Sequence, residues 1–335
     1  MSTDMKRREF ISLLGGAAAA FASPPAARAQ QDRRVRRIGV LMGLVENDPD
    51  AQPRIAAFRK RLQELGWTEG RNIQFDYRWM TPGGERLRAD AAELVKNAPD
   101  LIVADTTSAL AALRPFSGDI PVVFLRVSDP VGGGFIDNLA RPGGKITGIA
   151  NFEYAMGGKW LELLKQIAPR LSRMTVLSYP GSSAHAGLWQ VIESAAPSFK
   201  LEAKNAPVRD TAEIERAILA AAGEPDSGLL LLPFVTIEIN RAAIIDLAAR
   251  HRLPAIYPLH HFATAGGLIA YGVEALDLYR QTAVYVDRIL KGTRPSDLPV
   301  QQPGKFELVI NLKTAKMLGL EVSSMLLALA DEVIE

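Results

Sequence analysis

Small hydroxyl side chains and one carboxylate follow two apolar runs of the chain and could bind the charged ends of a small molecule. Thr106, Thr107 and Ser108 come just after the apolar run 101–104, and Asp129 follows the next run along the chain. Hydroxyl and backbone N–H groups at the start of a helix can donate to a carboxylate, and a carboxylate can receive an ammonium group. Thr107 and Ser108 could equally cap a helix, and Asp129 could equally fix a turn before the next proline.

Carboxylate and aromatic side chains occur in other predicted loops. Glu46 or Asp48, in the loop after the first apolar run, could also receive an ammonium group. The aromatic residues that could form apolar walls for a ligand are Phe152, Tyr154, Tyr179, Phe234 and Tyr257. This mixture of hydroxyl, acidic and aromatic side chains favours a zwitterionic or aromatic small organic ligand.

No catalytic or cofactor-binding motif accompanies these residues. The sequence has no Cys, no G-x-S-x-G motif and no Walker loop, and the glycine run 132–134 lacks the G-x-G-x-x-G spacing of a dinucleotide site. His185 and His251 lie in helix-like segments among charged or polar neighbours, which favours solvated side chains. His260 and His261 are adjacent, a spacing that is poorly suited to chelating one ion. We therefore expect neither enzymatic activity nor a bound metal or cofactor.

The composition is that of a folded protein without a basic surface. The 335 residues are 48% hydrophobic and 23% charged, and this length favours two domains. Residues 1–29 hold four basic and two acidic side chains, which leaves 35 of each sign in the rest of the chain. Binding to nucleic acid requires a basic surface that displaces counterions from phosphate, so we expect no nucleic-acid partner.

The first thirty residues have the composition of an export signal. Basic residues at 6–8 precede a small, mostly apolar run over 12–22, and an A-x-A site follows at 27–29. These are the parts of a secretory signal, and the paired arginines followed by two apolar residues are typical of twin-arginine export. The apolar run is shorter than the roughly 20 residues that span a bilayer. We expect a signal peptide over 1–29, cleaved near Ala29, and a soluble mature protein in the periplasm, with an uncleaved membrane anchor as the alternative.

Apolar runs that predict strands alternate with segments of helical period along the rest of the chain. Ile55, Phe58 and Leu62, for example, recur at three- and four-residue steps and predict one face of a helix. This alternation favours an α/β fold in which helices cover both faces of parallel sheets. The predicted strands are 37–42, 72–79, 101–104, 120–124, 146–150, 174–178, 229–232 and 253–257.

A weak internal repeat divides the chain into two similar halves. Residues 99–124 and 225–257 each contain Pro-Asp before a strand, then a helix, then a strand introduced by proline. The repeat predicts two doubly wound lobes, joined near the strand 146–150 and facing each other across a cleft. Open α/β sheets bind ligands at the carboxyl ends of their strands. The loops expected there are 43–48, 105–108, 126–130, 179–183, 233–236 and 258–261.

Several short segments, spread over the whole chain, form a specific combination. They include VSDPV at 127–131, LARPGG at 139–144 and GKWLELL at 158–164. The others are 7–16, 38–41, 46–49, 65–67, 69–72, 146–148 and 306–315. Together they resemble the substrate-binding proteins of ABC transporters, of the tryptophan/tyrosine type.

The resemblance implies a type I periplasmic-binding-protein fold with two doubly wound parallel-sheet lobes joined by a three-strand hinge. The expected N-terminal lobe is 35–150 plus 268–300, and the expected C-terminal lobe is 151–267 plus 301–335. In such proteins the chain crosses between the lobes three times, and the hinge closes on the ligand. The resemblance also implies that the ligand passes to a permease and an ATPase that are separate chains.

The resemblance further implies which residues contact the ligand. Amino-acid binders of this type place a hydroxyl pair after the third strand, matching Thr107 and Ser108, and an acidic residue in the Ser-Asp-Pro loop, matching Asp129. Tyrosine/tryptophan-type members have an asparagine or glutamate in the first loop, which Asn47 or Glu46 could supply. The expected ligand-binding residues are Glu46, Asn47, Thr106, Thr107, Ser108, Asp129, Phe152, Tyr179, Phe234 and Tyr257.

The second lobe departs from the family pattern and leaves the identity of the ligand open. Residues 180–183 replace an Asn-Pro-type turn, and 233–236 is apolar. We expect a monomeric solute-binding component of an ABC importer that binds a small carboxylate-bearing ligand, amino-acid-like or aromatic. The alternative is a periplasmic ligand-sensing module that delivers its signal to a membrane receptor. A third class, a periplasmic α/β enzyme, would require turnover of a bound compound.

Overall fold

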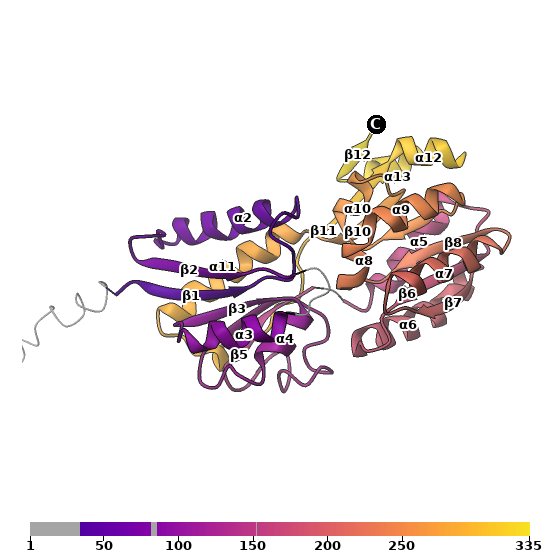
Figure 1. The fold of residues 1–335 in the computed structure, drawn as a ribbon. Coiled ribbons are helices and arrows are strands. Elements are labelled where there is room, and N and C mark those ends of the chain that lie inside the picture. Colours follow the sequence, from indigo (N-terminus) through magenta and orange to yellow (C-terminus); the bar gives the residue numbers. More distant parts are fainter. Residues whose placement is uncertain (1–33, 82–85, 152) are drawn as a thin grey trace, which may run out of the picture.

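Residues 34–81, 86–151 and 153–335 are described by a computed structural model, in which they form two α/β lobes (Figure 1). The expected signal peptide, residues 1–29, lies outside this description, as does Phe152. Each lobe is a sheet with helices on both faces. Over the described residues, no helix combines the length and the apolar character needed to cross a bilayer.

The first lobe is built on a five-stranded parallel sheet with the strand order β2-β1-β3-β4-β5. β3 and β4 are buried along their whole length because helices cover both faces of the sheet, and this explains the apolar runs 101–104 and 122–125 with which they begin. One apolar cluster includes α2 and α11, and another includes α3 and α4. The strands are β1 (Arg36–Leu41), β2 (Ile73–Arg78), β3 (Leu101–Asp105), β4 (Val122–Val127) and β5 (Ile146–Ala150), and the helices are α2 (Ala51–Glu64), α3 (Leu87–Lys96), α4 (Thr107–Leu113) and α11 (Ala275–Leu290).

The second lobe is built on a seven-stranded sheet with the strand order β12-β11-β10-β9-β8-β6-β7. Its strand pairs are parallel except for β10 and β11, which run antiparallel. The strands are β6 (Arg173–Ser178), β7 (Glu202–Pro207), β8 (Ser227–Leu231), β9 (Ala255–Tyr257), β10 (Ile269–Val273), β11 (Phe306–Asn311) and β12 (Glu332–Ile334). The helices are α5 (Met156–Ile167), α6 (Ser183–Ala195), α7 (Thr211–Ala222), α8 (Val235–Ile239), α9 (Arg241–Arg250), α10 (His260–Thr264), α12 (Leu312–Leu318) and α13 (Ser324–Leu329), with a short 3-10 turn at Ala196–Phe199. A second 3-10 turn, Pro295–Asp297, contacts β5 and belongs to the first lobe.

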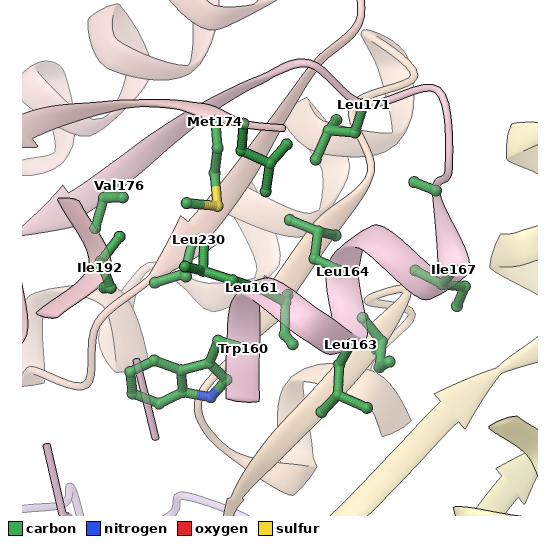
Figure 2. Packing of buried hydrophobic residues seen from close by; sticks show 14 of the residues in the cluster. Trp160, Leu161, Leu163, Leu164, Ile167, Leu171, Met174, Val176, Ile192 and Leu230 are labelled. Atoms are coloured by element: carbon green, nitrogen blue, oxygen red, sulfur yellow. The ribbon is translucent and has the colours of Figure 1, made fainter. Parts of the chain in front are cut away.

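The apolar core beneath α5 is the part of the second lobe that supports the cleft. Figure 2 shows Trp160 and the leucines of α5 packed over Met174 and Val176 of β6. Trp160 is 1% exposed, and its indole N–H donates to the backbone oxygen of Tyr271 at 2.7 Å. The helix is therefore tied to β10 by a hydrogen bond as well as by apolar contact.

The two blocks of the internal repeat occupy equivalent places in the two sheets. In the first lobe, β3, α4 and β4 follow one another next to β1. In the second lobe, β8, the two helices α8 and α9, and then β9 follow one another next to β6. Read from the opposite edge, the second sheet begins β7-β6-β8-β9-β10 and so repeats the order of the first. The structure thus confirms the prediction of two doubly wound lobes.

Within the described residues, the chain crosses between the lobes three times. It leaves the first sheet after Ala150, returns after Val273, where β10 leads into α11, and crosses again between Gln301 and β11. Gln301 runs beside β5, since the N–H of Ala150 donates to its backbone oxygen at 2.9 Å. The expected boundary at residue 268 placed β10 in the first lobe. The structure differs, because pairing with β9 and β11 holds β10 in the second sheet.

Candidate ligand-binding site

A cavity of about 320 Å³ lies between the lobes. Its walls come from the loops after β3 and β4 in the first lobe and from the loops after β6, β8 and β9 in the second. These are the carboxyl ends of the strands, where open α/β sheets place their ligands. The volume is at the lower end of the range of about 300–1,000 Å³ that is typical of small-molecule sites.

Five of the residues predicted from the sequence line this cavity. They are Thr106, Thr107, Ser108, Tyr179 and Phe234. The first three come from the start of α4 in the first lobe, and the other two come from loops of the second lobe. The structure therefore brings the predicted hydroxyl groups and two of the predicted aromatic rings to one space.

Two other predicted residues have structural roles outside the cavity. Tyr257 is 1% exposed, and its ring stacks on Phe262 with the centroids 5.1 Å apart, so it belongs to the core of the second lobe. The carboxylate of Asp129 accepts the N–H of Gly132 at 2.8 Å. Asp129 therefore fixes a turn, which was the structural alternative for this residue.

The first predicted loop contacts the second lobe without lining the cavity. Glu46 and Asn47 are exposed. Further along this loop, Asp48 forms an ion pair with Arg241 of α9 at 3.1 Å. At the start of α2, Asp50 lies 2.9 Å from the Nδ1 atom of His261 in α10. The side chains from this segment that reach the second lobe are thus Asp48 and Asp50, and both already have protein partners.

Hydroxyl groups of the first lobe line part of the cavity. Thr107 Oγ1 accepts the backbone N–H of Ser128 at 3.1 Å, which leaves the Thr107 hydroxyl proton free to be donated. Ser108 is exposed, and its side chain has no hydrogen-bond partner among the described residues. Ser128 in turn donates to the side-chain oxygen of Asn151 at 3.0 Å. Thr107 and Ser108 can therefore donate to an anionic group of a ligand.

Aromatic rings line the cavity as well. The rings of Tyr179 and Phe234 stack at a centroid distance of 5.9 Å and an interplanar angle of 29°. Trp160 and Phe135 also line the cavity. Because the indole N–H of Trp160 is already bonded to Tyr271, Trp160 contributes an apolar surface. Flat apolar surfaces of this kind suit an aromatic or long aliphatic group.

A buried histidine joins the two loops that carry these rings. The Nδ1 atom of His185 accepts the N–H of Tyr179 at 2.8 Å, and its Nε2 atom lies 3.2 Å from the backbone oxygen of Pro233. These partners require a neutral ring with its proton on Nε2. The ring also meets Phe234 edge-on at 5.6 Å. The expectation of a solvated side chain is therefore wrong for His185, which is 3% exposed, whereas His251 is exposed as expected.

Stability should fall with decreasing pH because His185 must stay neutral. Burial lowers its pKa from 6.5 to about 4, outweighing the opposite effect of the hydrogen bond to Pro233. Between these two values the unfolded chain binds the proton more tightly than the folded protein does. We expect the free energy of unfolding to decrease as the pH drops from about 6.5 to about 4, by up to about 3 kcal/mol. Urea unfolding across this range measures the effect.

The matched controls for this prediction are two glutamine variants. His185→Gln should lower stability at neutral pH but remove the step between pH 6.5 and 4. His251→Gln, at an exposed position, should keep the step unchanged. A step of equal size in His185→Gln and in the unmodified protein would assign the pH dependence to other groups.

An ion pair between the lobes completes the cavity. Arg126 Nη2 lies 2.7 and 2.9 Å from the two carboxylate oxygens of Glu238, and Arg126 Nη1 lies 3.5 Å from Asp105 Oδ1. Arg126 belongs to β4, at a point where the pairing register with β5 shifts, and its φ is +55°. Such a bulge redirects a side chain away from the sheet. Burial lowers the pKa of the Arg126 guanidinium, but the charges of Glu238 and Asp105 have the larger combined effect and raise it above its usual value.

The sequence did not predict Arg126 or Glu238 as site residues. A signal was present, because Arg126 opens one expected cleft loop and Glu238 follows the loop 233–236. Opposite charges thus lie beside cleft loops of the two lobes.

Asp105 also holds the first loop in place, since its Oδ2 accepts the N–H of Gly43 at 3.0 Å. A Cβ atom at Gly43 would lie 2.4 Å from Thr106 Cγ2, so only glycine fits there without displacing its neighbours.

Comparison with known proteins finds similarity over most of the chain. Residues 38–334 match a family model described as ABC transporter substrate binding protein. A "Tyrosine-binding protein" of Clostridioides difficile (strain R20291) is 26% identical over 292 residues, which are 86% of this chain and 82% of that protein. Among solved structures, a conserved domain protein from Vibrio cholerae O1 biovar El Tor is 27% identical with a TM-score of 0.81, covering 90% of this chain and 100% of that one. A Streptococcus pneumonia ABC domain in complex with L-Trp is 23% identical with a TM-score of 0.80, with the same coverage.

Proposed function

Because the chain belongs to the ABC transporter substrate binding protein family, we propose that it binds an aromatic amino acid between its two lobes and delivers it to a membrane permease. The permease and its ATPase would be separate chains. Members of this family are binding proteins and not enzymes. The expected leader over 1–29 fits this proposal, since a monomeric binding protein exported to the periplasm would meet its ligand there.

The cavity is the observation that carries the proposal. It combines donor hydroxyls of the first lobe with stacked aromatic rings of the second lobe, within about 320 Å³. A carboxylate fits the hydroxyl groups, and an aromatic side chain fits the rings. The names of two relatives, a tyrosine-binding protein and an ABC domain in complex with L-Trp, support the same ligand class.

Both lobes contribute to the proposed contacts. Thr107 and Ser108 come from the first lobe, whereas Tyr179 and Phe234 come from the second. A ligand that contacts both lobes binds their closed arrangement more tightly than an open one and therefore shifts the population toward it. The closed arrangement would present a surface by which the permease distinguishes the ligand-bound protein from the empty one.

A thermal-shift screen tests the ligand class. L-Trp, L-Tyr and L-Phe are compared with L-Leu, L-Glu, aromatic acids and nucleosides. A ligand that binds only the folded state adds about 2.7 kcal/mol at 100 times its dissociation constant. We expect the aromatic amino acids to stabilise the protein most. Stabilisation by a nucleoside alone, or by none of these compounds, would contradict the proposal. Once a ligand is found, a second experiment distinguishes import from sensing. A role in import predicts that the ligand-bound protein stimulates the ATPase of a reconstituted permease.

Removing the hydroxyl groups should weaken binding without unfolding the protein. We expect the double variant Thr107→Val with Ser108→Ala to bind the ligand about 10–100-fold more weakly, because hydrogen bonds to a charged group contribute about 1.5–3 kcal/mol. Isothermal titration calorimetry measures the affinity. The matched control is Thr293→Val with Ser296→Ala, which lies outside the cavity and should bind normally. Equal affinities for both double variants would remove Thr107 and Ser108 from the site.

A further inference from the structure

We infer that Glu238 receives the ammonium group of the ligand, and that its ion pair with Arg126 makes the cavity selective for ligands that carry a positive charge. This inference rests on the proposed function, which it refines. Both side chains line the cavity, and their exposed fractions are only 8% for Glu238 and 5% for Arg126. The sequence had suggested Asp129 for this role, but that carboxylate caps a turn.

The charges beside the cavity do not balance. Arg126 is the one cation in contact with Glu238 and Asp105 among the described residues, so these three side chains carry a net charge of −1. All three are at least nine-tenths buried. An uncompensated charge in such surroundings is costly, and a cationic group of a ligand would offset it.

The two other arginines in this region already have carboxylate partners of their own. Arg241 pairs with Asp48 at 3.1 Å and reaches Glu238 only through the backbone oxygen, at 3.2 Å. Arg54 lies 3.8 Å from Asp50. Each of them is therefore paired with a carboxylate other than Glu238 and Asp105.

Hydrogen-bonding capacity remains at the same place. Arg126 Nη1 faces Asp105 Oδ1 at 3.5 Å in an ion pair that is longer than a hydrogen bond of good geometry. A carboxylate offers about four lone-pair positions, and Arg126 engages Glu238 through a single nitrogen. Glu238 can therefore accept N–H groups of a ligand while it keeps its bond to Arg126. Since that bond joins the lobes, a bound ammonium group would also hold them together.

Three probes with the same indole ring test this assignment by calorimetry. L-tryptophan carries both charges, tryptamine carries only the ammonium group, and indole-3-propionate carries only the carboxylate. In the unmodified protein we expect indole-3-propionate to bind at least about 30-fold more weakly than L-tryptophan, the equivalent of one charge-assisted hydrogen bond. In Glu238→Gln, which keeps the shape and removes the charge, L-tryptophan should lose about 10–100-fold in affinity. The affinity for indole-3-propionate should change little.

The decisive measurement is the ratio of the affinities for L-tryptophan and indole-3-propionate. A purely structural role of Glu238 would weaken the binding of both ligands equally and leave this ratio unchanged. Asp129→Asn is the matched control and should leave the ratio unchanged. Equal binding of L-tryptophan and indole-3-propionate to the unmodified protein would overturn the inference even if Glu238→Gln failed to fold. An unchanged ratio in a folded Glu238→Gln would overturn it as well. If L-tryptophan, L-tyrosine and L-phenylalanine all fail to bind but tryptamine binds, the proposed function is wrong and the selectivity for positive charge stands.

Discussion

Trp160→Ala should lower the free energy of unfolding by about 3–5 kcal/mol, the cost of removing a large aromatic side chain from a core. Trp160 is 1% exposed and belongs to the apolar cluster between α5 and β6 (Figure 2). Truncation leaves a void that this cluster cannot fill by small movements. It also removes the indole N–H from the backbone oxygen of Tyr271. Urea unfolding followed by circular dichroism measures the loss.

Two further variants separate the causes of this loss. Trp160→Phe keeps most of the apolar volume and removes the N–H donor, so we expect a loss of about 1–2 kcal/mol. Trp189→Ala removes a half-buried tryptophan that packs at the edge of the same cluster, and it should cost less than Trp160→Ala. Similar losses for the two alanine variants would contradict a central role for Trp160.

Gly272→Ala should cost about 3 kcal/mol or more, because overpacking here involves backbone and not a flexible side chain. A Cβ atom on Gly272 would lie 1.7 Å from the backbone oxygen of Pro258 and 2.7 Å from its carbonyl carbon. This clash can be relieved only if β10 moves away from the segment after β9. Pro258 and Leu259 of that segment line the cavity. We therefore expect weaker ligand binding as well as lower stability, measured by calorimetry and urea unfolding.

Gly158→Ala is the matched control for this variant. Gly158 lies inside α5, and a Cβ atom there would meet nothing within 4 Å. Replacing a helical glycine by alanine stabilises a protein by about 0.5–1 kcal/mol. A loss of stability in Gly158→Ala, or none in Gly272→Ala, would show that the contact with Pro258 does not govern the effect.

The fold could be predicted from the sequence where the pattern is local. β3 and β4 begin with the apolar runs 101–104 and 122–125, which follow aspartate and proline, and these features require no knowledge of distant residues. The position of β10 could not be predicted in this way. Its place depends on antiparallel pairing with β11, a strand that follows only after α11. The boundary between the lobes was misplaced for that reason.

The candidate site was predictable only to the level of loops. Thr107 and Ser108 could be placed because residues after a parallel strand reach its carboxyl edge. The direction of a side chain at such an edge depends on contacts that the sequence does not reveal, and Tyr257 points into the core. Arg126 and Glu238 are 112 residues apart, and only the arrangement of the two lobes brings them together.

The position of α11 dictates the order in which the protein can be completed during synthesis. α11 (Ala275–Leu290) packs against α2 (Ala51–Glu64) in the apolar cluster of the first lobe, and Figure 1 shows its late, orange segment among the early, indigo ones. The second lobe has contributed β6 to β10 before α11 leaves the ribosome. Until then, the growing chain exposes the apolar face of the first sheet that α11 will cover. The N-terminal lobe is therefore begun first but finished only after most of its partner has been synthesised.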